Sequence, residues 1–308
     1  MKNGRISKCS CDEVLGTLDP HSYLPESTIS RLRVCIKGAG EMASAVAWRL
    51  FTAGIHKIVM VELPAPLAVR RRVSFSEAVY EGCQIVEGVQ AVRVDDMDSI
   101  DSAWQNDRIA VVVDPEWNYR RRFCPDVVVD AILAKRNLGS TISEAPLVIG
   151  LGPGFRAGFD AHFVIETNRG INLGKIVHDG YAEPNTGIPG NIGGVTTERV
   201  LRAPANGIFK PRREIGDIVR RGETIGWVAE AKVEALIDGL LKGLIRPGAP
   251  VSRGLKIGDI DPRGAAMPCD AISDKARAIA ESVLEVIFNT SQIEMPELLT
   301  QQFASADL

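Results

Sequence analysis

A glycine-rich turn near the start of the chain has the spacing of a phosphate-binding motif. Gly38, Gly40 and Ala43 occupy the small-residue positions of a G-x-G-x-x-A sequence, and Glu62 follows about 20 residues later. The first glycine allows a tight turn, the second lets the backbone approach a pyrophosphate, and the alanine lets helix and strand pack closely. The helix N-terminus attracts phosphate, and the acid can accept a hydrogen bond from a ribose hydroxyl. We therefore predict NAD(P) or another nucleotide as cofactor, with an empty structural turn as the alternative.

Four further side chains are candidates for the same nucleotide site. Met42 lies in the first turn of the predicted helix, and Asp114 ends a valine-rich strand. The carboxyl ends of parallel strands share one edge, which is where such sheets bind ligands. Arg70 and Arg71 begin an arginine triplet, residues 70–72, whose guanidinium groups suit phosphate. The alternative for this triplet is a solvated basic surface.

Polar side chains that could transfer a proton or hold an anion lie in a second region, which has eleven glycines from Gly150 to Gly194. Glu166 or His178 could act as general acid or base, and Arg169 could hold an anion. The sequence contains no nucleophile elbow, Ser-His-Asp order or metal-ligand spacing, so the reaction class stays open. For each residue the alternative is a polar group that satisfies loop backbone.

The elements that would position the glycine-rich turn follow a strand–helix–strand order. Residues 33–37 are a short apolar strand, residues 42–50 carry a helical apolar stripe, and residues 58–61 form a second strand. Further valine-rich strand patterns follow at residues 91–94, 110–114 and 126–130. Nearly continuous apolar strands are typical of parallel sheets covered on both faces. We predict an α/β fold in which residues 31–149 form a Rossmann-like, doubly wound parallel sheet that binds a nucleotide.

A duplication occupies residues 203–258. Six residues recur with an offset of 32 and no gap: Gly207, Gly216, Val219, Gly222, Ile225 and Gly226 return as Gly239, Gly248, Val251, Gly254, Ile257 and Gly258. Glycines at turns with branched residues between them indicate short strands. Each copy is too small to bury its own apolar face, so the two should pack as one pseudo-symmetric module. The pattern resembles the biotinyl/lipoyl type of β-rich barrel-sandwich hybrid, which we predict for residues 201–265.

The stretch that connects the two copies contains a lysine at the place where carrier domains are modified. Lys232 is flanked by Ala231 and Val233, whereas a carrier lysine usually lies between two methionines on a longer hairpin. We therefore expect no covalent biotin or lipoate at Lys232. A rigid docking or ligand-capping role is the alternative that we favour for the module.

Three segments complete the predicted organisation of the chain. Residues 1–30 are read as a poorly ordered N-terminal arm, residues 150–200 as a glycine-rich intermediate segment, and residues 266–308 as a C-terminal helix and tail. A helical apolar stripe between Ile272 and Ile287 should pack the helix back on the first domain.

The composition excludes several classes of protein. A net charge of -3 gives no support to nucleic-acid binding, and no apolar stretch approaches the roughly 18 residues of a membrane span. The N-terminus lacks an apolar signal core and the six cysteines are scattered, so we expect a cytoplasmic protein with reduced thiols. Cys9, Cys11 and His21 lack a four-ligand spacing, and no metal site is predicted. Homo-oligomerisation is left open.

Several longer motifs resemble the YqeB family of the selenium-dependent molybdenum hydroxylase system. The segments that carry the resemblance lie at residues 74–80, 130–137, 150–155, 166–170, 185–190 and 202–204. Together they extend over about residues 32–288. One departure is Ile171, where histidine is expected in this family, and its replacement would remove any proton-transfer role at that position.

The resemblance implies a cytoplasmic accessory or maturation protein whose partner is a molybdenum hydroxylase or its molybdenum cofactor. The function predicted from the chain is therefore that of a nucleotide-binding maturation factor. Two alternatives stay open: an NAD(P)-dependent oxidoreductase acting on a small substrate, and a non-catalytic scaffold whose nucleotide domain is empty.

Overall fold

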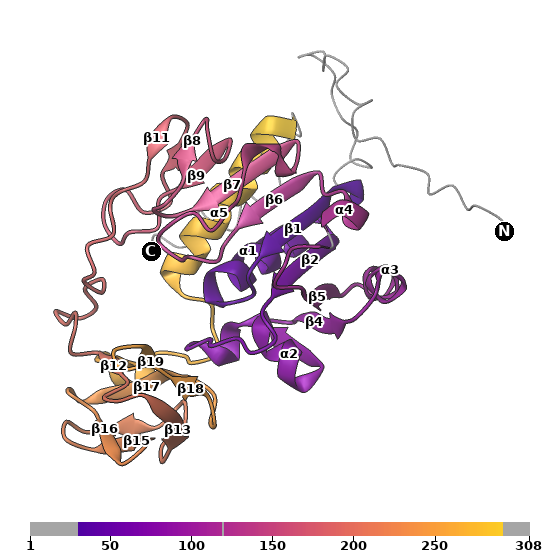
Figure 1. The fold of residues 1–308 in the computed structure, drawn as a ribbon. Coiled ribbons are helices and arrows are strands. Elements are labelled where there is room, and N and C mark those ends of the chain that lie inside the picture. The colour runs from indigo at the N-terminus through magenta and orange to yellow at the C-terminus, as the bar shows by residue number, and fades with distance from the viewer. Residues whose placement is uncertain (1–29, 119, 292–308) are drawn as a thin grey trace.

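The computed structural model describes residues 30–118 and 120–291 (Figure 1). A nine-stranded sheet with its helices forms the larger part, which we call the body. Its strands are β1 (Arg33–Lys37), β2 (Lys57–Glu62), β3 (Cys83–Val86), β4 (Val89–Val94), β5 (Ile109–Val113), β6 (Val127–Asp130), β7 (Leu147–Leu151), β9 (Phe163–Ile165) and β10 (Ile176–Val177). Their order in the sheet is β10-β9-β7-β6-β1-β2-β5-β4-β3.

The sheet is mixed and mostly parallel. All neighbours from β4 to β9 pair in parallel, and the two outermost pairs, β3–β4 and β9–β10, are antiparallel. From β1 the chain moves outward through β2 in one direction and through β6 and β7 in the other. The carboxyl ends of β1 and β6 therefore border the point where the winding reverses, and such points form ligand crevices in open parallel sheets.

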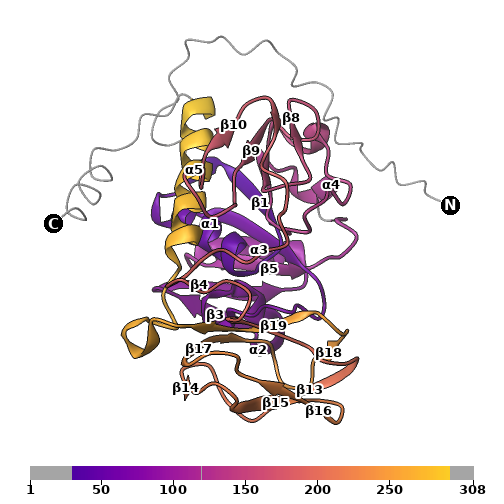
Figure 2. The same cartoon turned by 90° about the vertical axis from the view of Figure 1, so that its left-hand side faces the viewer.

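Helices cover both faces of the sheet, but unevenly (Figure 2). One face carries α1 (Glu41–Thr52) and α5 (Asp274–Ser291), which pack against each other and share one core with Ile36 and Ile58. On the opposite face, α3 (Met97–Gln105) and α4 (Arg120–Phe123) cover Cys35 and Val59. A short helix, α2 (Ala78–Glu81), lies near the edge strands. The predicted packing of the C-terminal helix on the first domain is confirmed.

The second part, which we call the small module, consists of two four-stranded antiparallel sheets. Its strands are β12 (Val200–Arg202), β13 (Gly207–Pro211), β14 (Ile218–Val219), β15 (Thr224–Val228), β16 (Ala231–Glu234), β17 (Gly239–Leu244), β18 (Pro250–Val251) and β19 (Lys256–Asp261). The sheet orders are β12-β19-β17-β14 and β16-β15-β13-β18. A shift of 32 residues converts each strand of one order into the corresponding strand of the other.

The hydrogen bonds of the small module follow the same exchange. The Gly216 N–H donates to the Leu241 carbonyl at 2.9 Å, and the Gly248 N–H donates to the Phe209 carbonyl at 2.9 Å. Gly222 with Ala235 and Gly254 with Ala203 form a second such pair, each at 2.8 Å. Each copy thus completes the other, and the predicted pseudo-symmetric packing of the duplication is confirmed.

The glycine-rich stretch contributes more to the body than the sequence indicates. The boundary predicted after residue 149 falls inside β7, and β9 and β10 extend the main sheet beyond it. Two short strands, β8 (Arg156–Ala157) and β11 (Gly180–Tyr181), pair beside them. The strand patterns at residues 161–166 and 174–178 are predicted by the sequence, but the high glycine content does not show that they extend the main sheet. The predicted N-terminal arm lies outside the described residues, apart from Ser30.

Candidate functional site

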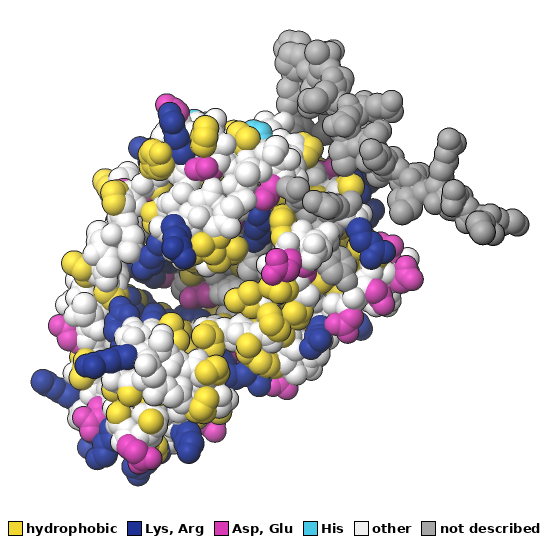
Figure 3. Space-filling view, viewed as in Figure 1, with side chains coloured by type: hydrophobic (Ala, Val, Ile, Leu, Met, Phe, Trp, Pro, Cys, Tyr) yellow, Lys and Arg dark blue, Asp and Glu magenta, His cyan; other side chains and the backbone are white. Residues whose placement is uncertain are grey.

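A pocket of about 420 Å³ is lined by residues of both the body and the small module. The space-filling view shows the surface hollowed there, with lysine and arginine side chains along the walls (Figure 3). The body contributes the start of α1, the loops after β6, β7 and β9, and the start of α5. The small module contributes β12, β17 and β19, together with the chain that leads into β12. Two helix N-termini therefore line one pocket, and both favour a negatively charged occupant.

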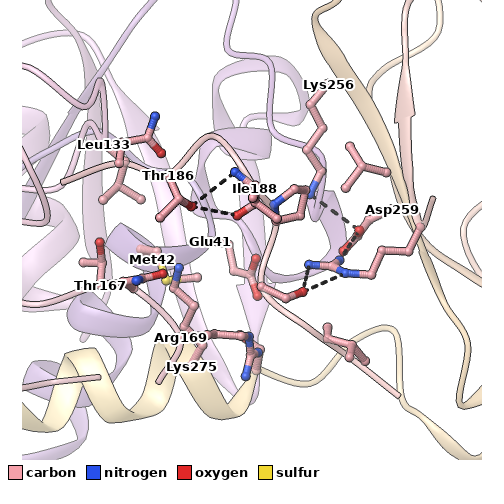
Figure 4. Close-up of a pocket in the computed structure, with 18 of the residues that line it drawn as sticks. Glu41, Met42, Leu133, Thr167, Arg169, Thr186, Ile188, Lys256, Asp259 and Lys275 are labelled. Carbon is pink, nitrogen blue, oxygen red and sulfur yellow. Dashed lines mark hydrogen bonds and ion pairs between the residues drawn. The ribbon is translucent and has the colours of Figure 1, made fainter. Parts of the chain in front are cut away.

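The glycine-rich turn lies beside this pocket. Glu41 and Met42, which follow Gly40, line it (Figure 4). Gly38 has φ +90° and its N–H donates to the Val61 carbonyl at 2.7 Å, so this glycine makes the predicted turn. Ala43, in the first turn of α1, is fully buried.

Glu62 holds the glycine-rich turn against the end of β2. One carboxylate oxygen accepts the Ala39 N–H at 2.7 Å and the other accepts the Leu63 N–H at 2.8 Å. Burial raises the pKa of Glu62, and these two hydrogen bonds oppose that shift. Each oxygen has a second lone pair that could accept a further hydrogen bond, although Glu62 does not line the pocket.

Arg70 is the one member of the arginine triplet that lines the pocket, and it is buried. Its guanidinium donates to the carbonyls of Cys269 and Ala271 and lies 3.4 Å from the Glu41 carboxylate. This places a fixed cation beside the first turn of α1. A phosphate role for Arg70 stays a prediction.

Arg71 and Arg72 attach the small module to the body. Arg71 donates to the Leu244 carbonyl at 2.8 Å, and Arg72 donates to the Ile215 carbonyl at 2.5 Å. The Val69 carbonyl accepts the Leu244 N–H at 2.8 Å, so backbone also bridges the two parts. Any phosphate contact of Arg71 would have to compete with these bonds.

The remaining predicted residues are divided between the pocket and other places. Glu166 lines the pocket but is 2 % exposed, and its carboxylate accepts the N–H groups of Asn168 and Glu183, both at 2.6 Å. It organises loop backbone, which is the structural alternative stated for it. His178 is exposed and stacks edge-on against Phe163, away from the pocket lining. Asp114 is buried at the end of β5 and does not line the pocket either.

Arg169 lines the pocket and is held in place by α5. Its guanidinium makes two hydrogen bonds to Asp274, at 2.7 and 2.8 Å. These bonds lower the pKa of Asp274 well below its usual range. Ile171 is fully exposed and does not line the pocket, so the position of the expected histidine is remote from this site.

Sequence reasoning gave no site role to the charged residues that the small module brings to the pocket, which we call the module wall. They are Arg199, Arg202, Lys242, Lys256, Asp259, Asp261 and Arg263. Asp259 pairs with Arg199 at 2.5 Å, and Asp261 pairs with Lys242 at 3.1 Å. Burial alone would raise the pKa of Asp261, but the hydrogen bonds from Arg263 and Lys242 lower it far below its usual range. Comparison of the two copies could have revealed this wall. Lys256, Asp259 and Asp261 of the second copy correspond to uncharged residues 32 positions earlier in the first copy.

No cluster of three or more His, Cys, Asp or Glu side chains suited to a metal ion occurs in the described part of the chain. Cys9 and Cys11 lie outside that part. Lys232 lies within β16, opposite Trp227, rather than at the tip of its hairpin. None of the helices at residues 30–118 and 120–291 combines the length and hydropathy that a membrane crossing requires.

Comparisons with known proteins give one extended similarity. The chain is 47% identical over 254 residues to an Escherichia coli protein, "Uncharacterized protein YqeB". The match covers 82% of this chain and 47% of that protein, so the chain spans about half the length of the curated relative that it matches. No protein-family model matches the chain.

Likeness to solved structures is weak. A succinylglutamate desuccinylase/aspartoacylase from Rhodobacter sphaeroides matches 21% of this chain and 22% of its own, with 29% identity and a TM-score of 0.19. TcdA (CsdL) matches 86% of this chain and 90% of its own, with 12% identity and a TM-score of 0.32. At these TM-scores neither match assigns a fold or an activity.

Proposed function

We propose that the chain binds a nucleotide at the glycine-rich turn and acts as an accessory factor for a molybdenum hydroxylase or its cofactor. In this proposal the parallel part of the body is a Rossmann-like nucleotide domain. The small module is a barrel-sandwich hybrid that closes the other side of the pocket. The bound group would be NAD(P) or another nucleotide.

Gly40 is the observation that carries the nucleotide proposal. It has φ -70° and ψ -175°, which any residue can adopt, and a Cβ built on it meets nothing within 4 Å. Every other described glycine either has a φ that disfavours side chains or has tight neighbours at its Cβ position. The fold therefore does not require glycine at position 40. Another reason for glycine at this position is that it lets a ligand approach the backbone closely.

The N-cap position strengthens this argument. Gly40 is the N-cap of α1 and provides no side-chain hydrogen bond, although serine or aspartate would stabilise the helix better. A glycine cap leaves the first N–H groups of the helix without a side-chain acceptor, so they are available to a phosphate. The helix dipole adds to the attraction.

The test is a thermal-shift panel with NAD, NADP, FAD, ATP and CTP on the wild type and on Gly40→Asp. A ligand at about 100 times its Kd stabilises by roughly 2.7 kcal/mol, which moves the midpoint of a chain this size by several degrees. Gly40→Asp should keep or slightly raise the midpoint without ligand, because aspartate caps α1, and should lose the ligand shift. Ser102→Asp, which adds the same charge to the exposed face of α3, is the matched control.

The outcomes separate the alternatives. An unchanged ligand shift in Gly40→Asp would remove the site. A shift with NAD or NADP that is accompanied by nicotinamide turnover on small substrates would favour the oxidoreductase. No shift with any nucleotide would favour the scaffold.

The accessory role rests on the resemblance to the YqeB family and on the identity to the Escherichia coli protein. Its test is a pull-down with the tagged full chain from cells that make a molybdenum hydroxylase, with Gly40→Asp as the comparison. Recovery of the hydroxylase with the wild type supports the role, and recovery of none contradicts it. The proposal places this interaction in the cytoplasm.

A further inference from the structure

The excess positive charge of the pocket comes from the module wall. Of the charged residues that line the pocket, the body supplies four basic and four acidic side chains, whereas the module wall has five basic and two acidic ones. The whole chain has a net charge of -3, so this is a local concentration of positive charge in an acidic protein. Such a concentration favours a ligand with more than one negative charge.

The duplication shows which of these charges the module does not need for folding. Lys256 of β19 corresponds to Thr224 in the first copy, and Asp259 corresponds to Trp227. Both copies form the same strands, so a lysine at the Lys256 position is not a requirement of this backbone. Lys256 lies 3.6 Å from Asp259 and its side chain is 40% exposed.

Across the pocket, Lys275 of α5 lies near the carboxylates of Glu41 and Glu166 without a direct ion pair to either. No hydrogen bond or ion pair to its ammonium group is present among the described residues. Burial lowers the pKa of Lys275 and the positive charge of Arg169 lowers it further, while the Glu41 carboxylate opposes this shift. Arg169 makes a bidentate pair with Asp274, whereas within the described part of the chain Lys275 has no direct ion pair and Lys256 has only the 3.6 Å contact with Asp259, so these two lysines can accept an anion between them.

The two sides of this pocket are held at a fixed separation. Gly243 of β17 packs so tightly on Val69 that an added Cβ would lie 2.8 Å from its side chain. Arg246 pairs with Glu77 at 3.3 Å and stacks on Tyr80 at 4.3 Å. The module wall therefore does not need to close on a ligand, and the cations are positioned before binding.

We infer that Lys256 and Lys275 together bind a phosphate group of the ligand, between the small module and α5. A phosphate carries about two negative charges at neutral pH, which matches two lysines in a pocket with excess positive charge better than a single carboxylate does. This inference rests on the proposed function, because the same pocket borders the glycine-rich turn. It adds the residues and the chemical class of the group that they hold.

The first test is competitive acetylation of lysines with acetic anhydride, read by mass spectrometry, with and without pyrophosphate. At ten times its Kd pyrophosphate occupies about nine-tenths of the sites, so acetylation of Lys275 should slow roughly tenfold. Lys210, the exposed counterpart of Lys242 in the outward sheet, is the internal control and should not change. Equal rates at Lys275 with and without pyrophosphate would overturn the inference.

The second test measures pyrophosphate affinity by calorimetry in Lys256→Thr, Lys275→Met and the control Lys210→Thr. Lys256→Thr installs the residue that the first copy carries, and Asp259 keeps Arg199 as its partner. Each pocket variant should weaken binding roughly tenfold, as expected for loss of one charged hydrogen bond, and the control should not. Lys275→Met should also raise the midpoint of the ligand-free protein, because it removes a charge that burial disfavours. A purely structural lysine would lower it.

Citrate distinguishes phosphate from carboxylate. If citrate protects Lys275 as well as pyrophosphate does, the assignment to phosphate is wrong. If nucleotides shift the wild type in a manner that depends on Gly40 but not on the two lysines, the inference fails and the proposed function stands. If pyrophosphate protects Lys275 and no nucleotide binds, the nucleotide proposal fails and the phosphate site stands.

Discussion

The two copies within the small module share their strands and differ in their surroundings. Lys242 of β17 is 8 % exposed and pairs with Asp261, whereas its counterpart Lys210 in β13 is exposed. Leu240 is 4 % exposed, and its counterpart Ile208 is 46 % exposed. At these two positions the copy that faces the body buries a charge and an apolar side chain, and the outward copy exposes both. Equivalent positions of the two copies therefore show how burial against the body changes residues on the same backbone.

The largest effect is expected from Asp261→Ala, which gives the inward copy the residue of its counterpart Ala229. The change leaves Lys242 buried without its carboxylate, and removal of one partner from a buried pair costs about 3–5 kcal/mol. The free energy of unfolding, measured by urea denaturation at pH 7, checks this. Lys242→Met with Asp261→Ala should recover much of the loss, and failure to recover any would mean that Arg263, the other partner of Asp261, dominates.

The pH dependence of the same variant has a defined sign. The pKa of Asp261 is lower in the folded chain than in the unfolded chain, so its stabilising contribution is complete above about pH 4 and is lost as the pH falls further. The difference in unfolding free energy between wild type and Asp261→Ala should therefore shrink below about pH 4. A difference that stays constant down to pH 2 would contradict the ion-pair account.

A smaller effect is expected where the inward copy touches the body. Gly243→Ala places a Cβ 2.8 Å from the Val69 side chain and 2.9 Å from its carbonyl, and overpacking of this kind costs about 1–3 kcal/mol. Its counterpart in the outward copy is Pro211, and Pro211→Ala should cost about 1 kcal/mol or less. Urea denaturation of the two variants gives the comparison. Equal losses would show that contact with the body is not what distinguishes the copies.

The smallest effect concerns Lys275, which the inward copy faces. Its folded pKa is below the unfolded value, so the unfolded chain binds more protons between the two and stability rises with pH in that range. Lys275→Met should be the more stable protein at pH 7, by about 0.5 kcal/mol, and this advantage should shrink as the pH approaches about 10. Denaturation midpoints at both pH values test the sign. A variant that is less stable at pH 7 would contradict the account.

Local patterns predicted the elements whose residues are close in sequence. The strand–turn–helix from Arg33 to Thr52 and the duplicated module are confirmed because glycine spacing and apolar periodicity record them directly. The pocket could not be read in the same way. Lys256 of β19 and Lys275 of α5 line the same pocket only because of tertiary packing. The partners of Arg71 and Arg72 are backbone carbonyls of the small module, and such partners have no sequence signature.

The path of the chain has a consequence for how the protein is made. The body begins at β1 and is completed by α5, and the whole small module is inserted between β10 and that helix. During synthesis the module, whose eight strands are contiguous, can fold as soon as it leaves the ribosome. The apolar side of α1 stays uncovered until α5 is synthesised, more than 200 residues later. We therefore expect the module to mature first, and truncations that remove α5 to yield a folded module attached to an aggregation-prone body.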